Sequence, residues 1–209
     1  MSTRIKEATR FPVVFKREMS RHRSLRMLVT KLARLRTVPT LNELYIWLRE
    51  TQTTAEDLRP YLSFKRATYT RYRIFSNAFA ELLILCWRPG QRTPIHDHNG
   101  SYGAVRVCEG MLWETTFGLN GSREPFYHSA RTWHAGQVVG ADVPDIHQLG
   151  NPDASGRNLV TLHLYAPPLR VINTYKLGSP FVERYSPTES EEGIIKDFVD
   201  PHLAHVRKV

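Results

Sequence analysis

The sequence predicts a mainly β protein, a β-sandwich or small barrel preceded by about three N-terminal α-helices. Apolar residues at helical spacing and capping signals fill residues 1–65. Short β-forming segments fill residues 66–185, separated by turn signals at the spacing of about 8–12 residues that sandwiches and barrels show. Residues 186–209 are a charged extension. Because helical patterns do not alternate with these strands, an α/β fold is excluded.

The helices are expected in a basic segment, residues 1–65, that packs on the barrel. The first spans about 19–36, where apolar residues recur at helical spacing: Leu25, Leu28, Val29, Leu32 and Leu35. Pro39 ends this stretch, and Thr40-Leu-Asn-Glu43 is a capping box that begins the second helix. Thr54-Ala-Glu-Asp57 predicts the start of the third.

The strands are expected where β-forming or apolar residues run between turns. These segments are 69–75, 81–87, 103–108, 111–117, 127–133, 137–139, the stretch around His147, and 159–165. Turns are predicted at Arg88-Pro-Gly90, at Glu109-Gly110 and at Gly118-Leu-Asn-Gly121. Residues 193–205 are expected to add a short helix.

The formal net charge of +9 lies wholly in the N-terminal segment. Residues 1–40 hold eleven Arg and Lys against Glu7 and Glu18, and the rest of the chain is balanced. Such an excess could bind nucleic acid or an acidic surface. No nucleic-acid motif or interleaved aromatic residues accompany it. We therefore interpret it as a solvated helix face and a loose tail.

The two cysteines, Cys86 and Cys108, are too few for a disulfide scaffold and lie in strand segments. We interpret them as inert buried thiols. No apolar run approaches the roughly 18 residues of a membrane span, and the N-terminus lacks the pattern of a secretory signal. A reducing cytoplasm is the expected compartment.

The run Pro94-Ile-His-Asp-His-Asn-Gly100 is the strongest candidate for chemistry. On an extended segment, His96 and His98 point to the same face while Asp97 points to the other. A third imidazole from His147 would complete a three-nitrogen metal site with open positions for substrate and oxygen. The alternative is a strand with two surface histidines. Ligand type alone would allow zinc, nickel, copper or iron.

The residues around these histidines resemble the two signature motifs of the cupin family. The first half runs from Gly90 through the histidine pair to Gly110, and the second from Gly136 through Pro144-Asp-Ile-His147 to Asn151. Cupins are small antiparallel β-barrels of the jelly-roll type that hold a metal in the barrel mouth. Most carry Glu five residues after the second histidine, where this chain has Gly103. Three histidines without that carboxylate are the mark of one branch, the thiol dioxygenases.

Other segments resemble the cysteine dioxygenases of that branch. Leu83-Ile-Leu-Cys-Trp87 is similar to their strand before the metal motif, and Thr161-Leu-His-Leu-Tyr165-Ala-Pro-Pro168 to their Ser-x-His-x-Tyr segment and Pro-Pro turn. Tyr69-Thr-Arg71 is similar to their Tyr-x-Arg substrate strand. The resemblance covers residues 69–175, about half of the chain.

The resemblance implies the metal and the substrate contacts. His96, His98 and His147 would hold one ferrous ion, Fe(2+), per chain. Arg71 would bind the substrate carboxylate through a bidentate pair, and Tyr69 would support it. Arg73, on the same strand face, and Arg170, after the Pro-Pro turn, remain alternatives.

The resemblance also implies a hydrogen-bond relay. Thr161, His163 and Tyr165 alternate and share a strand face, and the family uses this row to orient a tyrosine hydroxyl toward substrate and oxygen. Trp87 would line or brace the pocket, although a buried tryptophan is most often core. Gly103 takes the place of the cysteine that animal enzymes join to the tyrosine, so no thioether is expected, as in bacterial members. The Ala166-Pro167 bond is expected to be cis.

The function implied is oxidation of L-cysteine by O2 to cysteine sulfinic acid. The main rival substrate is 3-mercaptopropionate, but many members that prefer it carry Gln at the position of Arg71. A different class remains open, a non-catalytic metal-binding or thiol-sensing cupin that uses its basic N-terminal segment to bind a partner. We expect a monomer without membrane or nucleic-acid partners. The other histidines match no motif: His128, His134, His202 and His205.

Overall fold

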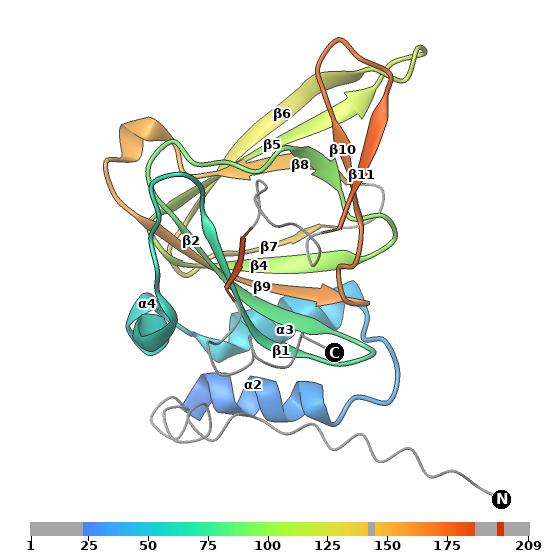
Figure 1. The fold of residues 1–209 in the computed structure, drawn as a ribbon. Helices are drawn as coiled ribbons and strands as arrows, with labels where there is room; N and C mark the ends of the chain where they lie inside the picture. Colours follow the sequence, from blue (N-terminus) through green and yellow to red (C-terminus); the bar gives the residue numbers. More distant parts are fainter. Residues whose placement is uncertain (1–22, 142–144, 187–195, 199–209) are drawn as a thin grey trace, which may run out of the picture.

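Two six-stranded sheets face each other in the computed structural model, which describes residues 23–141, 145–186 and 196–198 (Figure 1). Sheet A has the order β12-β1-β2-β9-β4-β7 and sheet B the order β11-β10-β3-β8-β5-β6. Sheet A comprises β1 Thr70–Ser76, β2 Glu81–Trp87, β4 Tyr102–Glu109, β7 Val138–Ala141, β9 Leu159–Ala166 and β12 Lys196–Phe198. Sheet B comprises β3 Ile95–Asp97, β5 Met111–Leu119, β6 Pro125–His134, β8 Ile146–Gly150, β10 Ile172–Tyr175 and β11 Val182–Tyr185. The predicted mainly β fold, with strands in facing sheets after the N-terminal helices, is confirmed.

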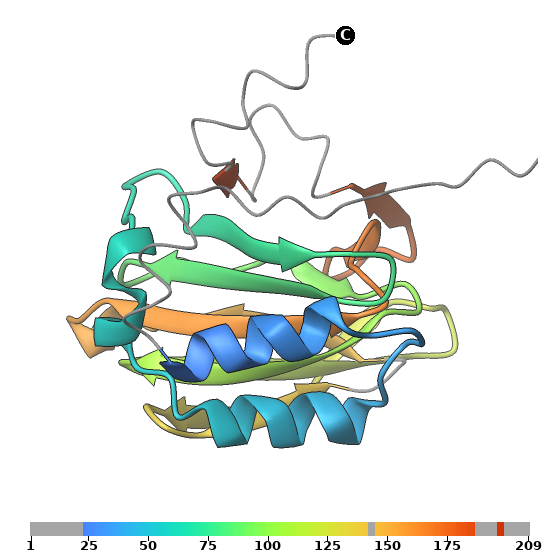
Figure 2. The ribbon, with the colours of Figure 1, turned by 90° about the horizontal axis from the view of Figure 1, so that it is seen from below.

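The helices lie on the outer face of sheet A (Figures 1 and 2). They are α2 Arg23–Ala33, α3 Leu41–Thr51, the short α4 Ala55–Leu58 and the 3-10 helix η1 Arg59–Tyr61. The predicted capping box begins α3, because the Thr40 N–H donates to Glu43 at 2.7 Å and the Glu43 N–H donates back to the Thr40 hydroxyl at 3.3 Å. Thr54 likewise donates its backbone N–H to Asp57 at 2.8 Å before α4. None of the described helices is long and apolar enough to cross a membrane.

Two apolar cores lie on the two faces of sheet A. Leu82 and Ile84 of β2 point outward and pack with the apolar faces of α2 and α3. Leu83, Leu85 and Trp87 of the same strand point into the barrel. Both faces of β2 are therefore buried, which explains why residues 81–87 read as a nearly continuous apolar run. The barrel interior between the sheets is where polar side chains can gather out of solvent.

Some elements differ from the sequence-based expectations. β5 continues to Leu119, so the turn predicted from Gly118 begins at Asn120. β10 and β11 were not predicted, because these four-residue strands carry little periodicity of their own. Residues 196–198 form β12, parallel to β1, where a helix was predicted over 193–205. Such pairing depends on a partner more than a hundred residues away, and local periodicity does not encode it. The rest of 193–205 and residues 1–22 lie outside the described residues.

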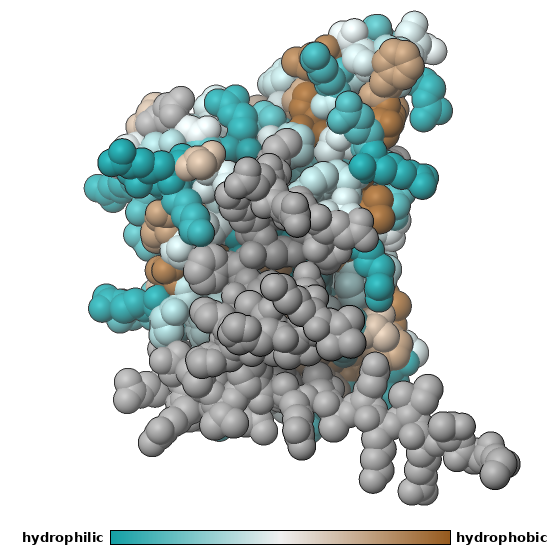
Figure 3. All heavy atoms as spheres, viewed as in Figure 1, coloured by the Kyte–Doolittle hydropathy of each residue, from teal (hydrophilic) through white to brown (hydrophobic). Residues whose placement is uncertain are grey.

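Most of the described surface on the face in Figure 3 is hydrophilic, with apolar side chains gathered near the β5–β6 and β10–β11 hairpins. Cys86 and Cys108 are free and buried. Burial raises the pKa of the Cys108 thiol to about 12 and also raises that of Cys86. Both thiols therefore stay protonated and unreactive, as predicted. The Ala166-Pro167 peptide bond is cis, as expected.

Candidate metal centre and substrate pocket

Three buried histidines meet inside the barrel. His96 lies on β3 and is the cross-strand partner of His147 on β8, and His98 follows β3 by one residue. One nitrogen from each ring lies within 4.8 Å of the others. All three side chains are buried. The strand pairing of β3 with β8 therefore brings together residues that are about fifty positions apart in the sequence.

Hydrogen bonds behind two of the rings fix which nitrogen faces the centre. The Nδ1 atom of His96 lies 3.0 Å from the carbonyl of Pro94, which can only accept, so this Nδ1 carries the proton. The Nδ1 atom of His147 lies 3.4 Å from Glu114, a carboxylate that can only accept, and its nearest oxygen of Asp145 is 3.1 Å away. The Nε2 atoms of both rings are left with free lone pairs. Such partners orient imidazoles in metal sites.

The spacing of these nitrogens fits a metal ion. The Nε2 atoms of His147 and His98 are 3.3 Å apart, close enough to share a proton in a hydrogen bond or to hold a cation between their lone pairs. Ligand nitrogens about 2.1 Å from an ion and at right angles to each other lie about 3 Å apart. Three such ligands occupy one side of an ion and leave the other side open. The donor set itself fits several transition metals.

Burial keeps the rings of His96 and His98 in the neutral form that binds metal. Desolvation, followed by the neighbouring His147, lowers the pKa of His96 to about 3. Desolvation and both neighbouring rings hold the pKa of His98 well below its ordinary value. Neutral imidazole is the state that a metal requires, so no proton has to be displaced from these two rings at neutral pH.

The metal-free protein is expected to lose stability as the pH falls below about 6.5, the ordinary pKa of histidine. Between this value and the pKa of about 3 for His96, the unfolded chain binds protons that the folded state excludes. The free energy of unfolding should then fall by up to about 1.4 kcal/mol per pH unit for each buried neutral histidine. Urea denaturation of chelator-treated protein at several pH values measures this change in the free energy of unfolding.

A His134→Gln variant is the control for this pH dependence, since His134 is exposed on β6. It should follow the parent curve. A stability that does not change with pH across this window would contradict the burial of neutral rings in the folded protein.

Glu114 contacts His147 on the side of the ring away from the other two histidines. This residue was not identified from the sequence. The indole N–H of Trp133 donates to one of its oxygens at 2.9 Å, and the other faces His147. Burial alone would raise the pKa of Glu114, but the bonds from His147 and Trp133 outweigh it and lower the pKa. A charged carboxylate behind a ligand histidine strengthens that ligand. A cavity of about 530 Å³ lined by β5, β6 and β7 reaches Glu114.

Replacing Glu114 with glutamine is expected to weaken metal affinity by about 10–100-fold, the usual cost of losing such a partner. The fold should persist, because glutamine keeps an acceptor for Trp133. Titration of the metal-free protein with ferrous or cobalt ions under nitrogen measures this. Glu183→Gln, on the exposed face of β11, is the matched control. Equal affinities for the two variants would contradict a role for Glu114.

A second polar row runs along β9 beside the histidines. The Tyr165 hydroxyl lies 3.1 Å from Nδ1 of His163, and Nε2 of His163 lies 2.8 Å from the Thr161 hydroxyl. The indole N–H of Trp87 donates to the same Thr161 oxygen at 2.9 Å. The Tyr165 ring lies against the His98 ring, with centroids 5.1 Å apart. This is the row that the sequence pattern placed on one strand face.

The tryptophan sets the direction of these hydrogen bonds. An indole can only donate, so the Thr161 oxygen accepts from Trp87 and its own proton goes to Nε2 of His163. The proton of His163 is then on Nδ1, where it is donated to the Tyr165 oxygen. The opposite direction would leave the buried Thr161 hydroxyl proton without an acceptor among the described residues. The Tyr165 proton is therefore available to a group in the pocket.

Both ring groups of this row are neutral. Desolvation, followed by the charge of Arg71, holds the pKa of His163 well below its ordinary value. Desolvation also raises the pKa of Tyr165 above its ordinary value, with Arg71 opposing it. At neutral pH the tyrosine is a phenol that can donate a hydrogen bond, not a phenolate.

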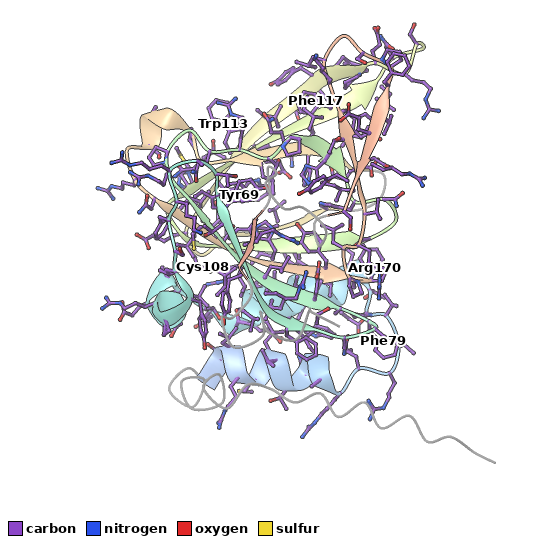
Figure 4. The ribbon with its side chains drawn as sticks, in the orientation of Figure 1. Tyr69, Phe79, Cys108, Trp113, Phe117 and Arg170 are labelled. Carbon is purple, nitrogen blue, oxygen red and sulfur yellow. The ribbon has the colours of Figure 1, made fainter. Side chains whose placement is uncertain are left out.

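The three candidate arginines differ in depth. The Arg71 side chain is only 3% exposed and Arg73 is 24% exposed, while Arg170 is exposed and lies beyond the end of β9 (Figure 4). The charge of Arg71 lowers the pKa of His96 as well as that of His163. Arg71 is thus the arginine that lies among the metal-site and relay residues.

Two buried hydroxyls near Arg71 have no hydrogen-bond partner among the described residues. Tyr69 stacks on Trp87 at a centroid distance of 4.1 Å and lies between the sheets (Figure 4). Its hydroxyl and that of Tyr185 are both unpartnered, and Tyr185 contributes to the raised pKa of Tyr69. Sequence reasoning missed Tyr185 because β11 itself was not predicted. Unpaired buried donors of this kind indicate a place for a polar ligand.

The structure thus brings the predicted site residues to one side of the barrel interior: His96, His98, His147, Tyr165, His163, Thr161, Arg71 and Tyr69. Asp97 points away, as predicted, and accepts hydrogen bonds from Asn173 at 2.9 Å and from Tyr175 at 2.6 Å. His128 and His134 lie on the exposed surface, and His202 and His205 lie outside the described residues.

Comparison with known proteins adds the family context. The family model described as "Cysteine dioxygenase type I" matches residues 20–177. Cysteine dioxygenase type 1 of Rattus norvegicus is 32% identical over 119 residues, covering 55% of this chain and 59% of that protein. The Danio rerio protein of the same name is 28% identical over 130 residues, covering 59% of this chain and 64% of that protein. The chain thus matches less than two thirds of the length of these relatives.

A solved structure from Klebsiella pneumoniae, described as an uncharacterized conserved protein with a double-stranded β-helix domain, is 15% identical. It covers 56% of this chain and 88% of its own chain, with a TM-score of 0.47.

Proposed function

We propose that this chain, which belongs to the cysteine dioxygenase type I family, is a thiol dioxygenase that acts on L-cysteine. The reaction adds both atoms of O2 to the sulfur, so that a thiol and dioxygen give a sulfinic acid with no other reductant. The observation that carries the proposal is the neutral Thr161–His163–Tyr165 row lying beside the three-histidine cluster. A protein that only stored or sensed a metal would not need this row.

The proposed cofactor is one ferrous ion per chain, held by the Nε2 atoms of His96, His98 and His147. When bound, it would supply the place where the thiolate and dioxygen meet. The three ligands are neutral, so they leave the charge of the ion uncompensated and favour an anionic sulfur. Glu114 and Pro94 hold two of the rings in position through their Nδ1 atoms.

The carboxylate of the substrate is proposed to bind Arg71. A guanidinium offers two parallel N–H groups to a carboxylate, and the unpartnered hydroxyls of Tyr69 and Tyr185 offer further donors. Burial of these three groups excludes water, which strengthens the interaction with a carboxylate. The substrate would thus be held by its carboxylate at one end and its sulfur at the other.

Tyr165 is proposed to donate its hydroxyl proton to the reacting oxygen or sulfur. His163 holds the phenol by donating to its oxygen, and Thr161 and Trp87 fix the direction of that bond. Gly103 has no side chain to join to the tyrosine, so we propose that the row works without a thioether. Tyr165 therefore depends on hydrogen bonds and packing alone for its position.

Metal analysis followed by oxygen uptake tests the proposal. The purified protein should contain iron and consume one O2 per L-cysteine, with cysteine sulfinate detected by mass spectrometry. Cysteamine, which lacks a carboxylate, should be a poor substrate. Faster turnover of 3-mercaptopropionate than of L-cysteine would show that 3-mercaptopropionate is the preferred substrate. Zinc in the site together with no oxygen uptake would favour the non-catalytic metal-binding class instead.

A further inference from the structure

Two buried tyrosine hydroxyls lie unpaired in the proposed substrate pocket. Tyr69, one residue before β1, is 1% exposed, and its ring stacks on Trp87. Neither its hydroxyl nor that of Tyr185 has a hydrogen-bond partner among the described residues, so the two hydroxyls do not bond to each other. Leaving a buried hydroxyl without a partner is unfavourable. The pair therefore indicates a site that a polar ligand completes.

The β10–β11 hairpin carries Tyr185 to this place. Its cross-strand partner is Ile172, which is 1% exposed, and Tyr185 packs against the same interior core. The other three residues of β11 are exposed. The next residue, Ser186, donates its hydroxyl to the carbonyl of Arg170 at 2.9 Å, which fixes the end of the hairpin. Tyr185 is thus the one side chain that β11 turns into the barrel, with its hydroxyl buried and its ring partly open to solvent.

The neighbours of the two hydroxyls indicate which group of the substrate they meet. Desolvation raises the pKa of Tyr69, and Arg71 and Tyr185 also act on it, so the three side chains lie close together. A buried carboxylate, that of Glu81, already lies 3.8 Å from Nη2 of Arg71. A substrate carboxylate at Arg71 therefore gains from further donors, and two hydroxyls supply them without adding charge. A carboxylate has about four lone-pair sites, enough to accept from a guanidinium and both hydroxyls at once.

We propose that Tyr185 determines substrate specificity, because its hydroxyl donates to the substrate carboxylate and its ring closes that end of the pocket. The hydroxyl selects thiols that carry a carboxylate, and the ring limits the length of the chain between carboxylate and sulfur. The distance from Tyr185 to the metal is fixed, since β11 pairs with β10 and β10 pairs with β3, the strand of His96. This inference rests on the proposed function, which places the carboxylate at Arg71.

Tyr185→Phe in the full-length, iron-loaded protein removes the hydroxyl and keeps the ring. Calorimetry without oxygen should show that L-cysteine, 3-mercaptopropionate and propionate bind more weakly, on the order of tenfold. Cysteamine, which has no carboxylate, should bind as it does to the parent. With oxygen, the KM for L-cysteine should rise by a similar factor, with a smaller change in kcat. Tyr127→Phe, an exposed tyrosine on β6, is the matched control and should behave as the parent.

Thermal unfolding without ligand separates binding from a structural role. The Tm of Tyr185→Phe should be equal to or above that of the parent, because the variant loses a buried hydroxyl that has no partner in the fold. A lower Tm would show that the hydroxyl serves the fold, and equal weakening of cysteamine would show a general distortion of the pocket. Weakening of L-cysteine but not of 3-mercaptopropionate would place the hydroxyl at the amino group. Each of these three results would overturn the proposal.

Tyr185→Ala tests the length limit set by the ring. The ratio of kcat/KM for homocysteine, which is one methylene longer, to that for L-cysteine should rise above the ratio of Tyr185→Phe. An unchanged ratio would overturn the length limit, and Tyr185→Leu gives the same comparison if the alanine variant does not fold. If the parent oxidises no thiol, the proposed function fails. The propionate titrations still decide in that case whether Tyr185 binds a carboxylate, because they need no turnover.

Discussion

The His98→Ala substitution is expected to abolish metal binding and thiol-dependent oxygen uptake together. The variant loses one of three neutral nitrogens, and two histidines do not hold a divalent ion firmly at neutral pH. The loss should exceed the 10–100-fold weakening expected for a residue behind the ligands. Metal content after dialysis and oxygen uptake with L-cysteine measure the two effects on the same sample.

His128→Ala is the matched control, because His128 is an exposed histidine on β6. It should keep the metal and the activity of the parent. The folded state of His98→Ala is checked by its unfolding in urea, where removing a buried neutral imidazole should also reduce the acid sensitivity of the metal-free protein. A variant that retains stoichiometric iron would show that the metal lies elsewhere.

The sequence predicts the strands of the barrel and the site residues that share a strand face, because both follow from the two-residue period of a strand. Thr161, His163 and Tyr165 alternate on β9, so their common face follows from their spacing alone. The same period predicts that His96 and His98 point together. The pairing of His96 with His147 across β3 and β8 could be expected only from the resemblance, since strand register is a tertiary property.

The residues that sequence reasoning missed are polar groups whose role depends on which face of their strand is buried inside the barrel. Glu81 begins a strand of nearly continuous apolar residues, and Glu114 stands in a strand of mixed polarity, so neither pattern indicates that the carboxylate itself points inward. One signal was present, because each carboxylate occupies the alternating face that otherwise carries interior residues, Leu83 beside Glu81 and Leu112 beside Glu114. Tyr185 carried no such signal.

The choice among the arginines shows the same limit. Arg71 and Arg73 share a strand face, so alternation alone cannot separate them. Their depth does, since one is almost fully buried and the other partly open to solvent. How deeply a side chain on a strand is buried depends on where the sheet ends and on what covers it. Neither can be predicted from the local sequence.

The Tyr165→Phe substitution is expected to lower kcat by about 10²–10³-fold, the usual cost of removing one donor aimed at the reacting atoms. KM should change little, because the proposed substrate contacts, Arg71 and the metal, are unchanged. The fold should persist, since phenylalanine fills the same space beside His98, but the buried His163 loses its acceptor, so the free energy of unfolding should fall by about 1–3 kcal/mol. Steady-state oxygen uptake with the iron-loaded variant measures both constants. An unchanged kcat would remove Tyr165 from the mechanism.

The Gly103→Ala substitution should reproduce this defect without touching the hydroxyl. Gly103 is the cross-strand partner of Tyr165, and a Cβ there would lie 2.5 Å from Cδ1 of the tyrosine ring. The ring must then move away, and its 3.1 Å bond to His163 breaks. Gly140→Ala is the control, because its Cβ would meet Leu41 at an ordinary 3.5 Å. If Gly103→Ala kept the kcat of the parent while Tyr165→Phe lost it, the Tyr165 hydroxyl would be needed for turnover but its hydrogen bond to His163 would not. A shared loss of kcat with retained iron would show that position and proton are both required.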